Sequence, residues 1–316
     1  NVIYSKDKTE LTVKENAYLI CEDGVCAGTF ENLPEKYEGL PFMDYGECLI
    51  IPGMTDLHVH APQYSYRGLG MDMELIDWLN AHAFPEESKF TDLEYAKRAY
   101  SIFVEDLVKS TTTRACIFGT LHKEATLLLM ELLENSGMKA YVGKVNMDRN
   151  SPDILREKSA EEAAKITEQW ILEAERFENV RQILTPRFIP SCSDELMREI
   201  ARLQKKYELP MQSHLSENLG EITWVQELCP ESKFYGDAYD QFELFGGDCP
   251  TIMAHCVHSG EEEVALMKEK NVFVAHCPQS NTNIASGIAP IRIYLDKDMK
   301  VGLGSDVAGG AHLSIM

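Results

Sequence analysis

The sequence predicts an α/β protein built as a TIM (β/α)8 barrel, with a small β domain at its N-terminal side. From about residue 49 onward, short β-branched runs alternate with longer amphipathic stretches, a pattern typical of βα units and a parallel sheet. The runs number eight, and a chain of 316 residues is long enough for such a barrel, which usually takes about 250 residues. Residues able to bind a metal follow several of these runs. We therefore expect residues 51–316 to form the barrel.

Residues 1–50 have a different pattern. Short apolar segments at 12–13, 17–20 and 48–51 are separated by the turn signals Asp23-Gly24 and Glu38-Gly39. They predict the N-terminal part of a small β-sandwich domain.

The eight runs predicted as barrel strands are 49–52 leading into 56–60, then 111–118, 140–145, 181–188, 210–214, 251–255, 272–276 and 301–305. Between the third and fourth runs, apolar residues from Ala163 to Phe177 recur at spacings of three and four, which predicts one face of a helix. Similar patterns predict helices at 127–133 and 196–207. The apolar stretch 71–79 predicts a packed helix, with a lid over the barrel mouth as the alternative.

The composition excludes several partners. The chain carries 51 acidic and 30 basic residues, a formal net charge of −21, which would repel nucleic acid and anionic lipid. No apolar stretch approaches the roughly 20 residues that cross a bilayer. Nine cysteines, an odd number without a C-x-x-C pair, predict reduced thiols in a cytoplasmic protein.

Histidines stand at the ends of the predicted strands. His58 and His60 are two residues apart on the first strand, so both side chains point the same way. Three further histidines end runs five to seven, and an aspartate follows run eight: His214, His255, His276 and Asp306. A single histidine at a strand end is more often a hydrogen-bonded structural residue. Because the carboxyl ends of barrel strands meet at one mouth, the group predicts a catalytic metal site for Zn²⁺, with Fe²⁺ as a substitute.

Glu217 lies three residues after His214. Taken alone it could be a solvated residue at the start of the next helix, where acidic side chains are favourable. Beside a metal ligand, we expect it to act as the general acid and base.

Four motifs resemble the amidohydrolase superfamily, and within it the branch of deaminases and chlorohydrolases. They are Pro-Gly-Met-Thr-Asp-Leu-His-Val-His at 52–60, His-Leu-Ser-Glu at 214–217, the stretch 276–281, and Gly-Leu-Gly-Ser-Asp at 302–306. Four further stretches, 61–65, 143–148, 185–188 and 306–310, are similar to the guanine deaminases of that branch. The resemblance extends from about Leu49 to the end of the chain.

The resemblance implies a role for each matching residue. One zinc ion per chain would be held by His58, His60, His214 and Asp306. His255 would hydrogen-bond the hydrolytic water, and Asp306, besides binding the metal, would take a proton from that water. Glu217 would shuttle protons. The purine would be contacted by Gln63, Arg187 and Phe188, with Arg187 facing the O6 carbonyl, and it would lie beside His214, Glu217 and Asp306. Binuclear relatives carry a lysine after the fourth strand, whereas 183–187 contains none, which favours a single metal.

The expected activity is the hydrolytic deamination of guanine to xanthine and ammonia by a metal-bound hydroxide. One alternative is another aminohydrolase of the same branch, acting on a different aminopurine, a pyrimidine or a triazine. A second alternative is an inactive metal-binding scaffold. The resemblance also implies that the chain forms a homodimer and that it binds a small-molecule purine as its substrate.

Members of the family continue past the Asp-Val-Ala-Gly-Gly segment, through the last barrel helix and back to the small β domain. Here six residues follow Gly310. We therefore expect a chain truncated after the eighth strand, without the C-terminal part of the β domain.

Overall fold

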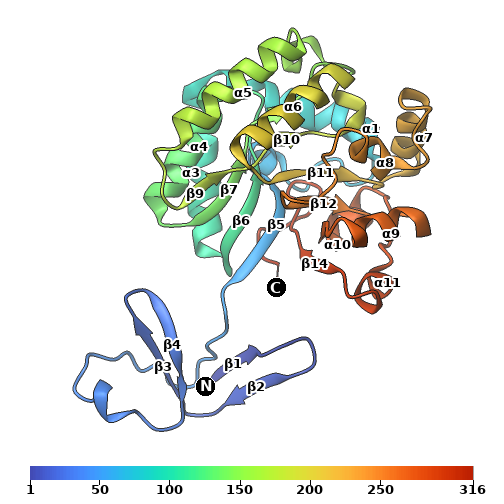
Figure 1. Ribbon diagram of the computed structural model, residues 1–316. Coiled ribbons are helices and arrows are strands. Elements are labelled where there is room, and N and C mark those ends of the chain that lie inside the picture. Colours follow the sequence, from blue (N-terminus) through green and yellow to red (C-terminus); the bar gives the residue numbers. More distant parts are fainter. Residues whose placement is uncertain (316) are drawn as a thin grey trace. The chain divides into compact units, whose positions relative to one another are not determined.

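The structure is a computed structural model that describes residues 1–315. The chain divides into two units, one of Asn1–Gly53 and one that begins at Met54. The first strand of the second unit is β5, labelled in Figure 1.

Two antiparallel hairpins make up the sheet structure of the first unit. Their strands are β1 (Val2–Ser5) with β2 (Leu11–Lys14), and β3 (Tyr18–Glu22) with β4 (Val25–Phe30). Asp23 and Gly24 both have positive φ, 49° and 77°, as a tight hairpin turn requires, so the turn predicted there is present. The segment expected at 48–51 contributes a single bridge, Val2 to Ile50. A short 3₁₀ helix, η1, spans Glu35–Tyr37.

Parallel strands form the centre of the second unit. One four-stranded sheet contains β5 (Met54–His60), β6 (Thr112–Phe118), β7 (Lys139–Gly143) and β9 (Val180–Gln182). The other contains β11 (Met211–Leu215), β12 (Thr251–His255), β13 (Phe273–His276) and β14 (Lys300–Leu303). A short parallel pair, β8 (Val145–Asn146) and β10 (Thr185–Pro186), follows β7 and β9.

Hydrogen bonds join the two sheets into a ring. At one junction Gln212 N donates to Leu184 O at 2.9 Å, beside the parallel bridge from Leu184 to Met211. At the other, Asp306 N donates to His58 O at 2.8 Å and His60 N to Val307 O at 3.2 Å. The predicted TIM-type barrel is therefore confirmed, and each of the eight predicted runs overlaps a strand.

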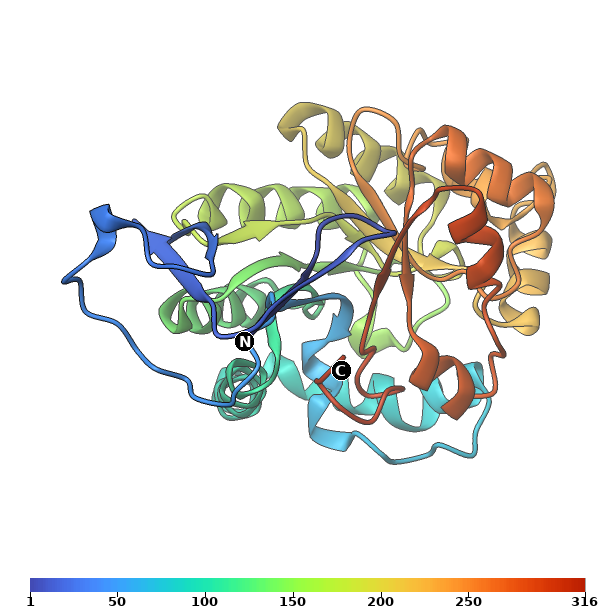
Figure 2. The same ribbon diagram turned by 90° about the horizontal axis from the view of Figure 1, so that it is seen from below.

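Helices lie on the outside of the strands (Figures 1 and 2). The longer ones are α3 (Leu93–Lys109), α4 (Lys123–Ser136), α5 (Ala160–Ala174), α6 (Asp194–Tyr207), α7 (Leu219–Leu228) and α9 (Glu261–Glu269). Two others, α8 (Tyr235–Asp240) and α11 (Ile291–Asp296), have six residues each. Several begin at a side-chain cap, such as Asp92 before α3, Ser193 before α6 and Asn218 before α7, which satisfies amide groups that the first turn leaves unpaired. No described helix combines the length and the apolar character that a bilayer crossing needs.

The remaining helical segments of the second unit are short. They are η2 (Ala61–Tyr66), α1 (Leu75–Trp78), the π-helical turn η3 (Leu79–Ala83), α2 (Phe84–Glu87), η4 (Ser88–Thr91), η5 (Asp153–Leu155), η6 (Ile189–Ser191) and α10 (Pro278–Asn283). The packed helix expected at 71–79 begins only at Leu75 and continues without a break through α1, η3 and α2, with Leu75, Trp78 and Leu79 buried.

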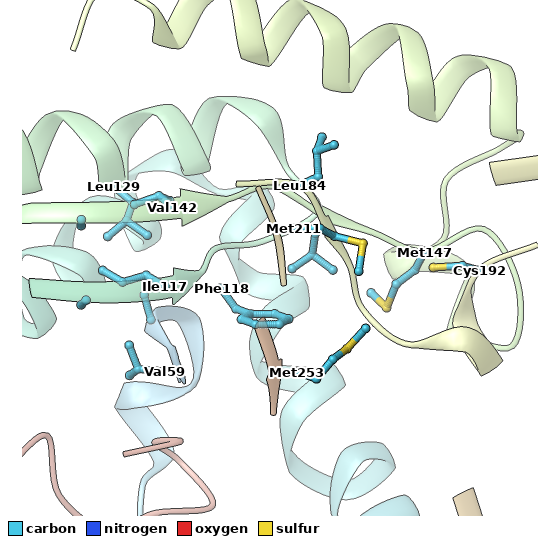
Figure 3. Close-up of a cluster of buried hydrophobic side chains, with 14 of the residues drawn as sticks. Val59, Ile117, Phe118, Leu129, Val142, Met147, Leu184, Cys192, Met211 and Met253 are labelled. Atoms are coloured by element: carbon cyan, nitrogen blue, oxygen red, sulfur yellow. The ribbon is translucent and has the colours of Figure 1, made fainter. Parts of the chain in front are cut away.

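The core contains buried side chains from many strands and from the helices outside them. Figure 3 shows part of it, with Val59, Ile117, Phe118, Leu129, Val142, Leu184, Met211 and Met253 all fully buried. Burying apolar surface at roughly 25 cal/mol per Å² stabilises the barrel. Because these residues anchor the strands, they also hold the polar side chains that follow them at the carboxyl ends.

Candidate active site

Five buried polar side chains meet at the carboxyl ends of four strands. The site contains His58 and His60 from β5, His214 from β11, His255 from β12, and Asp306 three residues after β14. Parallel strands place their carboxyl ends at one face of a barrel, so residues that are up to 248 positions apart in sequence come together.

Four donor atoms of this cluster have the spacing of a metal site. His60 Nε2 lies 3.2 Å from His58 Nε2 and 3.2 Å from His214 Nε2. Asp306 Oδ1 lies 3.2 Å from His58 Nε2 and 3.5 Å from His60 Nε2. Ligands at 2.0–2.1 Å from a tetrahedral ion are about 3.3 Å apart. The donor set and its spacing therefore fit a divalent metal ion.

The charge states of these residues also suit a metal. Burial lowers the pKa of His58, His60 and His214, which leaves the imidazoles neutral and able to coordinate. Burial by itself would raise the pKa of Asp306, but the neighbouring His58, His255 and His60 outweigh it and lower that pKa. The site therefore offers neutral nitrogens and one anionic oxygen.

Hydrogen bonds orient two of these side chains. His214 Nδ1 lies 2.7 Å from the Arg187 carbonyl oxygen, so it carries the proton and leaves the Nε2 lone pair toward the cluster. His255 Nδ1 lies 2.8 Å from Asn281 Oδ1, which by the same reasoning leaves its Nε2 as an acceptor.

Asp56 ties β5 to the segment after β14. Its Oδ1 accepts from the backbone N–H groups of His58 at 3.1 Å and Ser305 at 3.0 Å, and its Oδ2 accepts from the Ser305 hydroxyl at 2.5 Å. Burial raises the pKa of Asp56 to about 6. These hydrogen bonds hold the backbone at His58 and at Ser305, the residue before Asp306, and so fix the position of two residues of the cluster.

A cavity opens beside the cluster. The residues that line it are His60, Gln63, Leu75, Trp78, Leu79, Arg187, Phe188, His214, Glu217, Glu221, His255, Ile284 and Asp306. All three residues predicted to contact a purine, Gln63, Arg187 and Phe188, are among them. His276, at the end of β13, is half-buried and is in neither potential metal-binding group found among the described residues.

Glu217 lies at the cavity wall close to His255. Its Oε2 is 3.3 Å from His255 Nε2, and its Oε1 accepts from the Ser286 hydroxyl at 3.1 Å. Burial, and then the charge of Asp306, raises the pKa of Glu217 well above its usual value. A carboxyl group that holds its proton more tightly than usual is suited to serve as a general acid.

Two other buried carboxylates were not anticipated from the sequence. Glu221, whose pKa is raised to about 7 by burial and by Glu217, accepts from Glu217 N at 3.1 Å and from Tyr235 Oη at 2.8 Å. Glu87 accepts from Gln63 Nε2 at 2.8 Å and pairs with Arg187 Nη1 at 2.6 Å. Neither residue directly follows a strand, so the sequence gives no signal that separates them from surface glutamates. Only their burial in the folded chain does so.

Comparison with known proteins gives consistent similarities. Residues 49–316 match the model of the Amidohydrolase family. The chain is 44% identical over 272 residues to a probable guanine deaminase of Schizosaccharomyces pombe, covering 84% of this chain and 51% of that protein. It is 42% identical over 276 residues to guanine deaminase of Dictyostelium discoideum, covering 87% of this chain and 61% of that protein.

A solved structure is also similar. Guanine deaminase from C. acetobutylicum, with bound guanine in the active site, has a TM-score of 0.97 and 49% sequence identity, covering 100% of this chain and 75% of that one. The chain thus spans between half and two thirds of the length of the two sequence relatives.

Proposed function

The chain belongs to the amidohydrolase family, and we propose that it hydrolyses the 2-amino group of guanine, giving xanthine and ammonia. The observation that supports this most is that one cavity is lined by residues of the donor cluster, by Glu217, and by Arg187 and Gln63. The similar proteins named above, two guanine deaminases and one probable guanine deaminase, align with most of this chain's length.

We propose that one zinc ion per chain, with Fe²⁺ as a substitute, is held by His58, His60, His214 and Asp306. The spacing of their donor atoms supports this. When bound, such an ion supplies a water nucleophile at neutral pH by lowering the pKa of that water. The described residues that line the cavity include no lysine, which supports a single ion.

Glu217 and its neighbours would move the protons. The Glu217 carboxyl would give its proton to N3 of guanine, which makes C2 more electrophilic. Asp306 would accept a proton from the attacking water, and the His255 Nε2 lone pair would orient that water. After the C2–O bond has formed, the Glu217 carboxylate would take the proton of the new hydroxyl group as it becomes a carbonyl, and would pass that proton to the amino group as the C2–N bond breaks, so that ammonia leaves. The proton on Asp306 would then return to Glu217, which restores both groups.

Arg187 and Gln63 would bind the ring edge away from the reacting carbon, and Phe188 would offer an apolar face to the base. A guanidinium that donates to the O6 carbonyl should reject adenine, because adenine presents an amino group there and would leave a buried donor unpaired.

Turnover assays test this proposal. Guanine should be converted to equal amounts of xanthine and ammonia, and adenine should be converted far more slowly. Activity on adenine or a triazine without activity on guanine would favour the other aminohydrolases. Turnover of none of these compounds by metal-loaded protein would favour the scaffold.

The proton-shuttle role has a separate test. Glu217→Gln removes the transferable proton but keeps the shape of the side chain, so guanine turnover should fall by about 10²–10⁴-fold. Bound metal, measured by elemental analysis, should remain at one ion per chain. Unchanged turnover in this variant would refute the role of Glu217, and two ions per chain would refute the single-metal proposal.

We also propose a cytoplasmic homodimer that acts in purine catabolism. The cysteines, none of which forms a disulfide in the described residues, support a reducing compartment. Light scattering and fractionation would test the dimer and the location.

A further inference from the structure

We propose that Glu87 is a positioning residue that determines which purines this site accepts, because it holds Arg187 and Gln63 in one fixed arrangement. This inference rests on the proposed function, in which those two side chains bind the ring edge. Glu87 is not among the residues that line the cavity, so it would act through its two neighbours.

Each oxygen of Glu87 has its own partner. Oε1 accepts from Gln63 Nε2 at 2.8 Å, and Oε2 pairs with Arg187 Nη1 at 2.6 Å. The side chains of Glu87 and Arg187 are 2% and 3% exposed, so water does not compete for these bonds. Gln63 lies 24 positions before Glu87 and Arg187 lies 100 positions after it, and one carboxylate therefore joins three distant segments.

The bonding pattern also decides which way the Gln63 amide faces. An ionised carboxylate only accepts hydrogen bonds, so the NH₂ group of Gln63 must point to Glu87. On the other side, Gln63 Oε1 accepts from Ala308 N at 3.4 Å. The amide is held with its nitrogen toward one partner and its oxygen toward the other.

The guanidinium is held in a similar way. Its Nη1 is bound to Glu87, and its Cζ lies 5.2 Å from the centre of the Phe84 ring on the same short helix, α2. An arginine side chain presents five donors in a rigid planar fork. With Nη1 engaged, the direction of the remaining N–H groups is set, and these are the groups available to a carbonyl in the cavity.

A glutamine at position 87 could not do the same. It has almost the same shape but only one acceptor oxygen, and the donors of Gln63 and Arg187 lie at different oxygens of Glu87, so one of the two would lose its acceptor. Its NH₂ group would then face another donor. It would also leave the buried guanidinium without a counter-charge, which is costly. Binding that depends on the O6 carbonyl should weaken, whereas binding through the rest of the ring should not.

Two purines separate these effects. Hypoxanthine carries the carbonyl at position six and purine does not, and neither has a 2-amino group to be removed. Their inhibition constants are measured against guanine turnover with metal-loaded enzyme of the complete chain. In Glu87→Gln, hypoxanthine should bind roughly 10- to 100-fold more weakly, as expected for a lost hydrogen bond to a charged group, and purine less than about threefold more weakly. KM for guanine should rise more than kcat falls.

Glu157→Gln is the matched control. Glu157 is also buried and pairs with Lys144 at 2.7 Å, but it does not line the cavity. This variant should lower the melting temperature and leave the ratio of the two inhibition constants at the wild-type value. Glu87→Asp is the second test variant: it keeps the charge but is one methylene shorter, so it should shift the ratio in the same direction.

If the ratio of the two inhibition constants in the Glu87 variants equals the wild-type ratio, the positioning role is overturned. The proposed function would still be supported by guanine turnover of the wild type. Absence of guanine turnover in the metal-loaded wild type would overturn the proposed function and this inference with it.

Discussion

Replacing Glu221 by glutamine should remove a pH-dependent contribution to the stability of the fold. Glu221 is fully buried on α7, and burial together with the charge of Glu217 raises its pKa from 4.5 to about 7. A raised pKa means that the folded protein holds the proton more tightly than the unfolded chain does. The stabilisation is therefore fully present below pH 4.5 and is lost as the pH rises to about 7.

The shift of Glu221 sets the size of the effect. It amounts to about 2.5 pH units, and each unit corresponds to 1.36 kcal/mol, so the contribution is on the order of 3 kcal/mol. In Glu221→Gln the amide oxygen can still accept from Glu217 N, and the NH₂ group can donate to the Tyr235 hydroxyl, which accepts as well as donates. Packing and hydrogen bonds are thus retained while the titration is removed.

Urea unfolding of the wild type and the variant, at equal metal loading, measures this contribution. The free energy of unfolding of the wild type, minus that of the variant, should fall by about 3 kcal/mol between pH 4.5 and pH 7. Glu227→Gln provides the control, because Glu227 lies on the same helix but is exposed. Its unfolding free energy should follow the wild type at every pH.

A difference between wild type and Glu221→Gln that stays constant across this range would refute the reasoning. It would mean that the carboxyl group titrates alike in the folded and unfolded states.

Three further predictions concern the metal, the substrate and the barrel closure. His60→Ala removes the nitrogen that lies within 3.5 Å of three other donor atoms, so metal affinity, measured by competition with a chelator, should fall more than about tenfold; unchanged affinity would contradict the proposed ligand set. Arg187→Met should raise KM for guanine roughly 10- to 100-fold, as measured by steady-state kinetics, without creating activity on adenine. An unchanged KM would mean that Arg187 does not contact the base. Asp56→Ala leaves the buried Ser305 N–H and hydroxyl without their acceptor, so urea unfolding should show a loss of about 2–4 kcal/mol, whereas Ser305→Ala should cost less because it leaves fewer groups unpaired.

The barrel and the cluster of donor side chains could be predicted from the sequence because both depend on local order along the chain. Alternation of β-branched runs with amphipathic stretches predicts strands and helices, and a residue that ends a parallel strand lies at the mouth. His58 and His60 share a face because strand side chains alternate. This is why His214, His255 and Asp306 could also be assigned to the same site from their positions alone.

Other features depended on packing between distant segments. The apolar stretch 71–79 predicted a packed helix, and a packed helix begins at Leu75, but its change to a π-helical turn at Leu79 and the position of Leu75, Trp78 and Leu79 at the cavity could not be read from the pattern. His276 ends a strand as His255 does, yet it is not in the donor cluster. The direction in which a strand-end side chain points depends on the local backbone, which a pattern of apolar residues does not specify.

The sequence by itself determined the alternation of strands and helices, the residues at the strand ends and therefore which donor side chains meet at the mouth of the barrel. Only the tertiary structure decided that Glu87 joins Gln63 to Arg187 and that Glu221 lies behind Glu217. The reason is physical: a glutamate on a short helix has the same sequence signature whether it is solvated or buried. Its charge acquires a role only when the folded chain removes water and supplies the donors that it accepts from.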